Sequence, residues 1–255
     1  MEHATAVVLG SLAAGLSTGV GALPILLLRE VRPAATSAML GFGAGVMIAA
    51  SSFTLVGGAF TTLHERPAAA AFGWVALGLL AGAALMAVAE RALPHEHPEK
   101  GRDGPRSTFV RGAWLFVFAI ALHNLPEGLA VGAGFGAPDG DLGLVVAVGI
   151  VLQNLPEGLV AAASMRAIGK SRLQSLGIAA ATGIVETLGG LLGLGLGGAS
   201  SIVLALALAF AAGAMLYVVG QEVIPESHVR GREQLATWGL LAGFLAMVAC
   251  DRLLV

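Results

Sequence analysis

The stretch TLGGLLGLGLGGASSIVLALALAFAAGAMLYVVGQ (187–221) contains no Asp, Glu, Lys or Arg. The same four residue types are absent from six further runs: 34–64, 67–89, 112–126, 142–156, 173–185 and 234–250. A helix needs roughly 20 apolar residues to cross the hydrocarbon core of a membrane, and runs of this kind supply them. Over the whole chain of 255 residues, 56% are hydrophobic and only 12% are charged. Soluble domains carry roughly 25% charged residues, so these numbers predict an integral membrane protein.

The rest of the composition excludes other classes of protein. Cys250 is the single cysteine, so the chain offers neither a disulfide framework nor a cysteine-based metal cage. The net charge of -2 argues against a nucleic-acid partner. The N-terminal sequence MEHATAVVLG (1–10) lacks the basic segment of a signal peptide. We therefore expect the first apolar run to be a retained membrane span.

The apolar runs and the polar residues between them predict eight transmembrane helices in a single domain, residues 1–255. Helices are expected because each backbone group in lipid must find a hydrogen-bond partner within its own segment, and barrel strands would alternate polar and apolar residues. The fold class is thus an all-α integral membrane protein. The predicted helices cover approximately 4–28, 34–58, 68–89, 112–136, 142–165, 173–195, 201–224 and 235–254.

The distribution of basic residues predicts how the helices are oriented. The loops after the first, third, fifth and seventh helices contain twelve of the fourteen Lys and Arg residues. The opposite side has only Arg66 and Arg252. Because basic loops remain in the cytoplasm, we expect a multi-pass protein of the cell (inner or plasma) membrane with both termini outside. The twelve residues are Arg29, Arg32, Arg91, Lys100, Arg102, Arg106, Arg111, Arg166, Lys170, Arg172, Arg230 and Arg232.

The longest predicted loop, residues 91–111, contains the sequence PHEHPE (94–99). Its side chains His95, Glu96, His97 and Glu99 could bind a metal weakly, or they could simply belong to a polar linker. The HExxH signature of zinc proteases is absent from the sequence, and no hydrolase-like nucleophile or base stands out. We therefore predict that the protein is not an enzyme.

Two similar motifs lie near the centres of the fourth and fifth predicted helices. Residues 121–130 read ALHNLPEGLA and residues 151–160 read VLQNLPEGLV, with seven of ten positions identical. His123 and Glu127 are four residues apart, so they share one helix face. Gln153 and Glu157 repeat this arrangement, and Asn124 and Asn154 flank the same space. Pro126 and Pro156 have no backbone N–H, so each is expected to kink its helix and free a carbonyl oxygen.

Three carboxylates at membrane depth require a counter-charge. A carboxylate at the bilayer centre costs roughly 2.5–3.5 kcal/mol, and Glu127, Glu157 and Glu186 together cost on the order of 8–10 kcal/mol. No Lys or Arg lies at similar depth in the sequence. Protonated glutamates that hydrogen-bond between helices are the structural alternative. Three glutamates together with His, Gln and two Asn favour a bound divalent cation.

The types of ligand narrow the choice of metal. Imidazole with carboxylates suits Zn²⁺, Fe²⁺, Co²⁺ or Mn²⁺, whereas Mg²⁺ prefers oxygen ligands and retained water. Met47, in GAGVM (43–47), is a candidate accessory ligand, although core packing explains a buried methionine as well. The pattern GAMLY (213–217) resembles that segment and suggests an inverted repeat. Glu222, with Glu226 and His228, could form a second polar station near the cytoplasmic end of the seventh helix.

These motifs resemble the ZIP (Zrt/Irt-like protein) family of metal transporters. The resemblance rests on HNLPEG (123–128), QNLPEG (153–158), Glu186 in ATGIVETLGG (181–190) and GAMLYVVGQEVIPESH (213–228). It covers essentially the whole chain, and Gln153 is similar to the bacterial GufA-like branch. The family fold implied is a bundle in which helices 1–3 and 6–8 form an inverted repeat around helices 4 and 5.

The resemblance also implies a site for two metal ions. His123, Glu127, Gln153 and Glu157 would bind the first ion, and Asn124, Asn154 and Glu186 the second, with Glu127 and Glu157 shared. Some relatives have an acid in place of Asn154, so the second ion would bind more weakly here. The family further implies inward transport and a movement of helices 1, 4, 5 and 6 against the others.

The resulting hypothesis is uptake of Zn²⁺ into the cytoplasm, with Zn²⁺ as a transported substrate and no catalytic cofactor. A carrier for Fe²⁺, Mn²⁺ or a broad range including Co²⁺ and Cd²⁺ is one alternative. A membrane sensor that binds metal without transporting it is another. The expected partners are divalent metal ions and the lipid bilayer, and a homodimer is an open alternative.

Overall fold

The computed structural model describes residues 2–28, 30–92, 106–137, 141–196, 199–229 and 231–254. Within these ranges the chain forms helices and turns and no strand. The histidine-bearing segment 94–99 lies outside the described residues. Eight helical segments are long and apolar enough to span a membrane, which confirms the predicted number of spans.

Most spans consist of one α-helix, and the second and seventh are composite. The second comprises α2 (Pro33–Ala49), the π-helical turn η2 (Ala50–Leu55) and α3 (Val56–Thr62), so it extends beyond the predicted 34–58. The seventh comprises α8 (Ser201–Val218), the π-helical turn η5 (Val219–Val223) and α9 (Ile224–Ser227). The others are α1 (Glu2–Ala22) with η1 (Leu23–Leu26), α4 (Ala68–Ala92), α5 (Arg106–Gly136), α6 (Asp141–Ala167), α7 (Arg172–Gly193) with η4 (Leu194–Leu196), and α10 (Glu233–Leu253).

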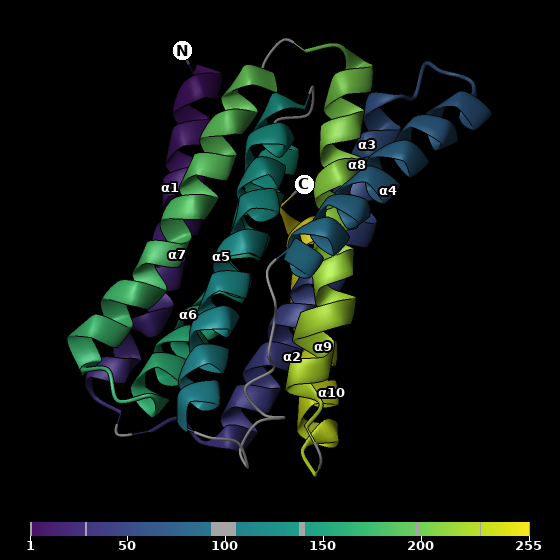
Figure 1. Cartoon of the computed structure of the whole chain (residues 1–255). Helices are drawn as coiled ribbons and strands as arrows, with labels where there is room; N and C mark the ends of the chain where they lie inside the picture. Colours follow the sequence, from purple (N-terminus) through teal and green to yellow (C-terminus); the bar gives the residue numbers. More distant parts are fainter. Residues whose placement is uncertain are drawn as a thin grey trace.

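The helices divide into two groups (Figure 1). The motif bundle consists of α1, α5, α6 and α7, in which α1 packs on α6 and α7, and α5 packs on α7. The flanking bundle consists of α2–α4 and α8–α10, in which α2 packs on α10 and α4 on α8. The surface where α5 and α6 meet α2, α3, α8 and α10 is the seam between them.

The packing of the flanking bundle agrees with the predicted inverted repeat. The second span packs on the eighth, and the seventh span packs on the third, so the two pairs are equivalent if spans 1–3 and 6–8 correspond. Each middle span of a triplet also contains a π-helical turn, which begins a few residues after Met47 or Met215. The segments GAGVM (43–47) and GAM (213–215) therefore each precede a π-helical turn, one in spans 1–3 and the other in spans 6–8.

Glycine allows helices within each bundle to touch backbone to backbone. In the motif bundle a Cβ added to Gly183 of α7 would lie less than 3.0 Å from the carbonyl oxygen of Gly15 of α1. In the flanking bundle a Cβ at Gly45 of α2 would overlap the carbonyl oxygen of Leu240 of α10 in the same way. Such contacts between small residues are the usual basis of helix association in membranes.

The glycines at the seam make a different kind of contact from Gly183 and Gly45. An added Cβ there would meet side chains as its nearest atoms: Glu157 at Gly43, Leu142 at Gly58, Leu204 at Gly136 and Met247 at Gly149. At these four glycines the two bundles contact one another through side chains, whereas glycines such as Gly183 and Gly45 bring helices of one bundle together through backbone.

Candidate metal site

The two motifs lie inside α5 and α6, and both helices continue through Pro126 and Pro156. Each proline lacks an N–H, so the carbonyl four residues earlier loses its usual helical donor. The four-residue spacing holds His123 above Glu127 on α5 and Gln153 above Glu157 on α6. The motifs thus place their polar side chains on buried helix faces without ending the helices.

All seven predicted ligands are buried. Each of them is at most 4% exposed, although they are among the most polar side chains of the protein. They come from three helices of the motif bundle, and Glu186 is the contribution of α7. The seven are His123, Asn124, Glu127, Gln153, Asn154, Glu157 and Glu186.

Two amide side chains link the carboxylates of different helices. Gln153 donates from Nε2 to Glu127 Oε1 at 2.5 Å, which joins the two motif copies. Asn154 donates from Nδ2 to Glu186 Oε2 at 2.7 Å and to the backbone oxygen of Ala14 at 3.0 Å. Because these contacts occupy the amide nitrogens, the amide oxygens of both residues are the atoms left for a ligand.

Many polar atoms of this cluster lack a hydrogen-bond partner within the described residues. They are His123 Nδ1, both amide atoms of Asn124, Glu127 Oε2, Gln153 Oε1, Asn154 Oδ1, both Glu157 oxygens and Glu186 Oε1. Leaving one buried polar atom unpaired costs about 1–3 kcal/mol, and more when the group is charged. A bound cation would satisfy several of these lone pairs at once.

The cluster is rich in acidic side chains and contains no Lys or Arg. Glu127 experiences the charges of both Glu157 and Glu186. None of the Lys and Arg side chains that the structure describes is buried. No three His, Cys, Asp or Glu residues of the described ranges converge with the spacing of a metal centre. Glu127 and Glu186 instead accept hydrogen bonds from amide donors, so the complete ligand set stays a prediction.

Glu222, predicted to belong to a second polar cluster near the end of the seventh span, lies next to a motif residue. It belongs to η5 of the flanking bundle, and its Oε2 lies 3.6 Å from His123 Nδ1 across the seam. A cavity of about 20 Å³ is lined by His123, Glu157, Glu222 and Glu226 together with apolar side chains. That volume is close to the minimum for one water molecule.

Met47 and His228 lie in different surroundings. Met47 is fully buried in the apolar core that includes Ile150 and Met215. A ligand role for Met47 remains a prediction. His228 lies beside Ser227 and Thr237, with ring nitrogens 2.8 and 3.2 Å from their hydroxyl oxygens. It does not line the small cavity around Glu222.

Gly43 is a site residue that the sequence analysis missed. A Cβ at this position would lie 3.3 Å from Glu157 Oε1, so the glycine leaves room for the carboxylate against α2. Its place in the GFGAG run (41–45) looks like ordinary helix-packing glycine. The sequence alone therefore gives no signal that separates Gly43 from its neighbours.

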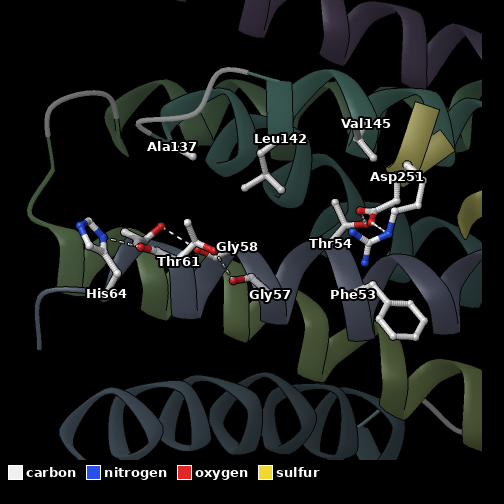
Figure 2. Close-up of a pocket in the computed structure, with 12 residues that line it drawn as sticks. Phe53, Thr54, Gly57, Gly58, Thr61, His64, Ala137, Leu142, Val145 and Asp251 are labelled. Atoms are coloured by element: carbon white, nitrogen blue, oxygen red, sulfur yellow. Dashed lines mark hydrogen bonds and ion pairs between the residues drawn. The ribbon is translucent and has the colours of Figure 1, made fainter. Parts of the chain in front are cut away.

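A larger cavity of about 330 Å³ lies on the seam, lined by residues of the second span, α6 and α10 (Figure 2). Leu142 of α6 faces Gly57 and Gly58 of α3 across it. Within it, Thr54 donates from Oγ1 to Asp251 Oδ1 at 2.9 Å. Asp251 was not predicted, because an acidic residue near the end of the last helix resembles any interfacial carboxylate.

Comparison with known proteins gives the family. The family model described as ZIP Zinc transporter matches residues 93–251. The chain is 45% identical to "Zinc transporter GufA" of Myxococcus xanthus over 245 residues, 94% of this chain and 96% of the relative. It is 43% identical to "Zinc transporter ZIPB" of Bordetella bronchiseptica over 251 residues, 98% of this chain and 81% of the relative. It is 33% identical to "Zinc transporter ZupT" of Corynebacterium glutamicum over 249 residues, 93% and 94% of the two chains.

These matches cover the motifs, the buried carboxylates and nearly the full set of spans. A multi-pass helical membrane protein with this pattern is a transporter and not an enzyme. The chain belongs to the ZIP family of zinc transporters.

Proposed function

We propose that this protein carries divalent transition-metal ions, Zn²⁺ foremost, into the cytoplasm through the buried cluster between α5 and α6. The observation that supports this most is the set of unpaired oxygen and nitrogen atoms on seven buried residues, with no buried Lys or Arg among the side chains that the structure describes. The names of the relatives, all zinc transporters, supply the choice of Zn²⁺.

Each residue type has a distinct task in this proposal. Glu127 and Glu157 supply the negative charge, and both are shared if two ions bind. His123 favours transition metals over Mg²⁺, because imidazole suits Zn²⁺ while Mg²⁺ prefers oxygen and water. Gln153 and Asn154 offer their amide oxygens, and their nitrogens stabilise the carboxylates when no metal is bound. Asn124 and Glu186 complete a second, weaker position.

The path proposed for the ion follows the seam. The larger cavity at the Asp251 end would admit the hydrated ion from the outside. The small cavity that joins His123 and Glu157 to Glu222 and Glu226 would receive it on the way to the cytoplasm. This direction depends on the excess of basic residues in the loops at the Glu222 end, and on the positive-inside rule.

The test is metal accumulation in proteoliposomes that contain the purified protein. We expect Glu157→Ala and His123→Ala each to lower Zn²⁺ accumulation at least about tenfold, the scale seen when metal ligands lose support. Glu65→Ala is the matched control, because the Glu65 side chain is 89% exposed and far from the motifs in sequence. Accumulation at the wild-type level by both site variants would refute the proposal.

Two further measurements distinguish a zinc transporter from a broad-range metal carrier and from a metal sensor. Competition by Fe²⁺, Mn²⁺, Co²⁺ and Cd²⁺ ranks the substrates, and equal competition by all of them would identify a broad carrier. Zn²⁺ that binds in stoichiometric amounts without accumulating in sealed vesicles would identify a sensor. Vesicles of known protein orientation report the direction of transport.

A further inference from the structure

An apolar groove lies between α5 and α7 on the outer surface of the motif bundle. Its volume is about 550 Å³, and its walls include Trp114, Phe118 and Ala121 of α5 and Ile178 and Ala181 of α7. The one hydroxyl in the wall, on Thr182, donates to the backbone oxygen of Ala179 at 2.8 Å. The groove therefore offers contact to hydrocarbon and no free polar group.

The groove is short along the helix axis. Its α5 wall runs from Trp114 to Ala121, about 10 Å along the helix at 1.5 Å per residue. A transmembrane helix is roughly 10–12 Å wide with its side chains and needs contact over most of the bilayer. A single acyl chain needs only a short, narrow channel. Trp114 and Phe118 are 42% and 46% exposed, so the groove opens to the surrounding lipid.

Positive charge gathers at one end of the groove. The Lys170 ammonium lies 5.4 Å from the centre of the Trp114 ring, within the range of a cation–π contact. Arg166 donates from Nη1 to the backbone oxygen of Lys170 at 2.5 Å, and its buried Nε has no partner among the described residues. Arg172 is exposed at the start of α7.

The stretch of chain that carries these three charges contributes no acidic residue of its own. The sequence between Glu157 and Glu186 contains no Asp or Glu. Trp114 is also the type of residue that membrane proteins place at the level of the lipid headgroups. Each Lys or Arg near a bilayer surface contributes about 1 kcal/mol to the attraction of anionic lipids. An apolar channel below a cationic rim matches the two parts of an anionic phospholipid.

We infer that this groove binds an anionic phospholipid of the adjacent leaflet, with an acyl chain between α5 and α7 and the phosphate beside Lys170 and Arg172. A zwitterionic lipid would fill the channel equally well, but its headgroup would gain less from the basic rim. The inference concerns the motif bundle alone and does not depend on metal transport. Its test therefore fails or succeeds independently of the function proposed above.

The experiment uses Trp114 as the reporter. In full-length protein with Trp74→Phe and Trp238→Phe, Trp114 is the single tryptophan, since the chain has three. The protein is reconstituted into vesicles in which dibrominated phosphatidylglycerol or dibrominated phosphatidylcholine replaces part of an unbrominated phosphatidylcholine bilayer. Bromine quenches tryptophan on contact, so quenching at each mole fraction gives the relative affinity. We expect preference for phosphatidylglycerol of at least about fivefold, one basic side chain's contribution.

Three variants localise the lipid. Lys170→Gln with Arg172→Gln should remove most of the preference, and Ala181→Phe should remove it by filling the channel while the charges remain. Lys170→Arg should keep it, and Arg91→Gln, which removes a charge from α4 in the other bundle, should leave it unchanged. Equal quenching by both lipids would overturn the inference. A preference that survives either the double charge change or Ala181→Phe would also overturn it.

Discussion

The helix contacts within the motif bundle and within the flanking bundle differ from the contacts between the two bundles. Inside a bundle, glycines such as Gly183 and Gly45 bring the backbone of one helix onto the backbone of another. At the seam, Gly58 and Gly149 meet the ends of Leu142 and Met247. Flexible side chains can change rotamer and contact new neighbours at small energetic cost. Close backbone contacts, in contrast, fix the position of one helix along the other.

From this difference we propose that the seam is the surface on which the bundles shift. The cavities of about 330 Å³ and about 20 Å³ lie on it, and so does the pair His123 and Glu222. The predicted movement of spans 1, 4, 5 and 6 against the others divides the helices along the same line. We therefore expect transport to require changes at the seam and to tolerate fixed contacts within each bundle.

The largest effect is expected from locking the seam. In a Cys250→Ser background, Gly58→Cys with Leu142→Cys places two thiols on opposite sides of the larger cavity. Oxidation or a bifunctional mercury reagent should then abolish Zn²⁺ uptake, and dithiothreitol should restore it. Uptake is measured with a fluorescent zinc indicator in the vesicle lumen.

The matched control joins two helices of one bundle. Gly19→Cys with Ala180→Cys links α1 to α7 inside the motif bundle, where an added Cβ at Gly19 would lie 3.2 Å from the Ala180 Cβ and meet no backbone atom closer than 3.7 Å. This cross-link should leave uptake near the uncross-linked level. If both cross-links block uptake, or if neither does, the seam is not the moving surface.

A second comparison concerns stability. Gly183→Ala should destabilise the protein by about 3 kcal/mol, because the new methyl group overlaps the backbone of α1 and inserted atoms in packed interiors cost typically 1–3 kcal/mol. Gly149→Ala should cost less than about 1 kcal/mol, since the thioether of Met247 can rotate away. Thermal unfolding in detergent measures both. Equal losses of stability would contradict the proposed contrast.

A third prediction concerns the polar contact across the seam. Glu222→Gln removes the charge opposite His123 while it keeps the size of the side chain. We expect Zn²⁺ uptake to fall about threefold to tenfold, because the ion loses an anionic partner after it leaves the motifs. Initial rates at several Zn²⁺ concentrations test this, with Glu65→Gln as the control. Unchanged rates would remove Glu222 from the path.

The smallest effect is expected from a polar contact inside one bundle. Thr54→Val removes the hydroxyl that donates to Asp251 and should cost about 1 kcal/mol of stability, the typical net value of one hydrogen bond. Uptake should change less than twofold, because the Asp251 carboxylate stays in the entry cavity and the lost bond joins η2 and α10 of the same bundle. A large loss of uptake without a loss of stability would assign Thr54 to the ion path itself.

The spans were predictable because bilayer insertion depends on composition, which the charge-free runs display directly. The burial of Glu127, Glu157 and Glu186 followed for the same reason, since their helices have no other place for them. The four-residue spacing in each motif also fixed which side chains share a face. These parts of the fold and site arise from local sequence and the thickness of the membrane.

Other features depend on which helix packs on which, and local sequence does not contain that information. The contact of Glu222 with His123 requires α8 and η5 to lie beside α5, and the role of Gly43 requires α2 to lie beside α6. The π-helical turn at Ala50–Leu55 adds no unusual residue to the sequence, so the second span was predicted too short. Gln153 and Asn154 were predicted as ligands, and their bonds to Glu127 and Glu186 were not.

The three acidic side chains of the cluster also have an electrical consequence. With all three ionised and no basic residue beside them, the empty cluster carries three negative charges. One divalent ion leaves one net negative charge, and two leave one net positive charge. Displacing one elementary charge through 100 mV is worth about 2.3 kcal/mol, so the two loadings would respond to membrane voltage with opposite sign. The sign of the charge displaced when the metal-loaded protein moves, recorded before steady state, would then distinguish one bound ion from two.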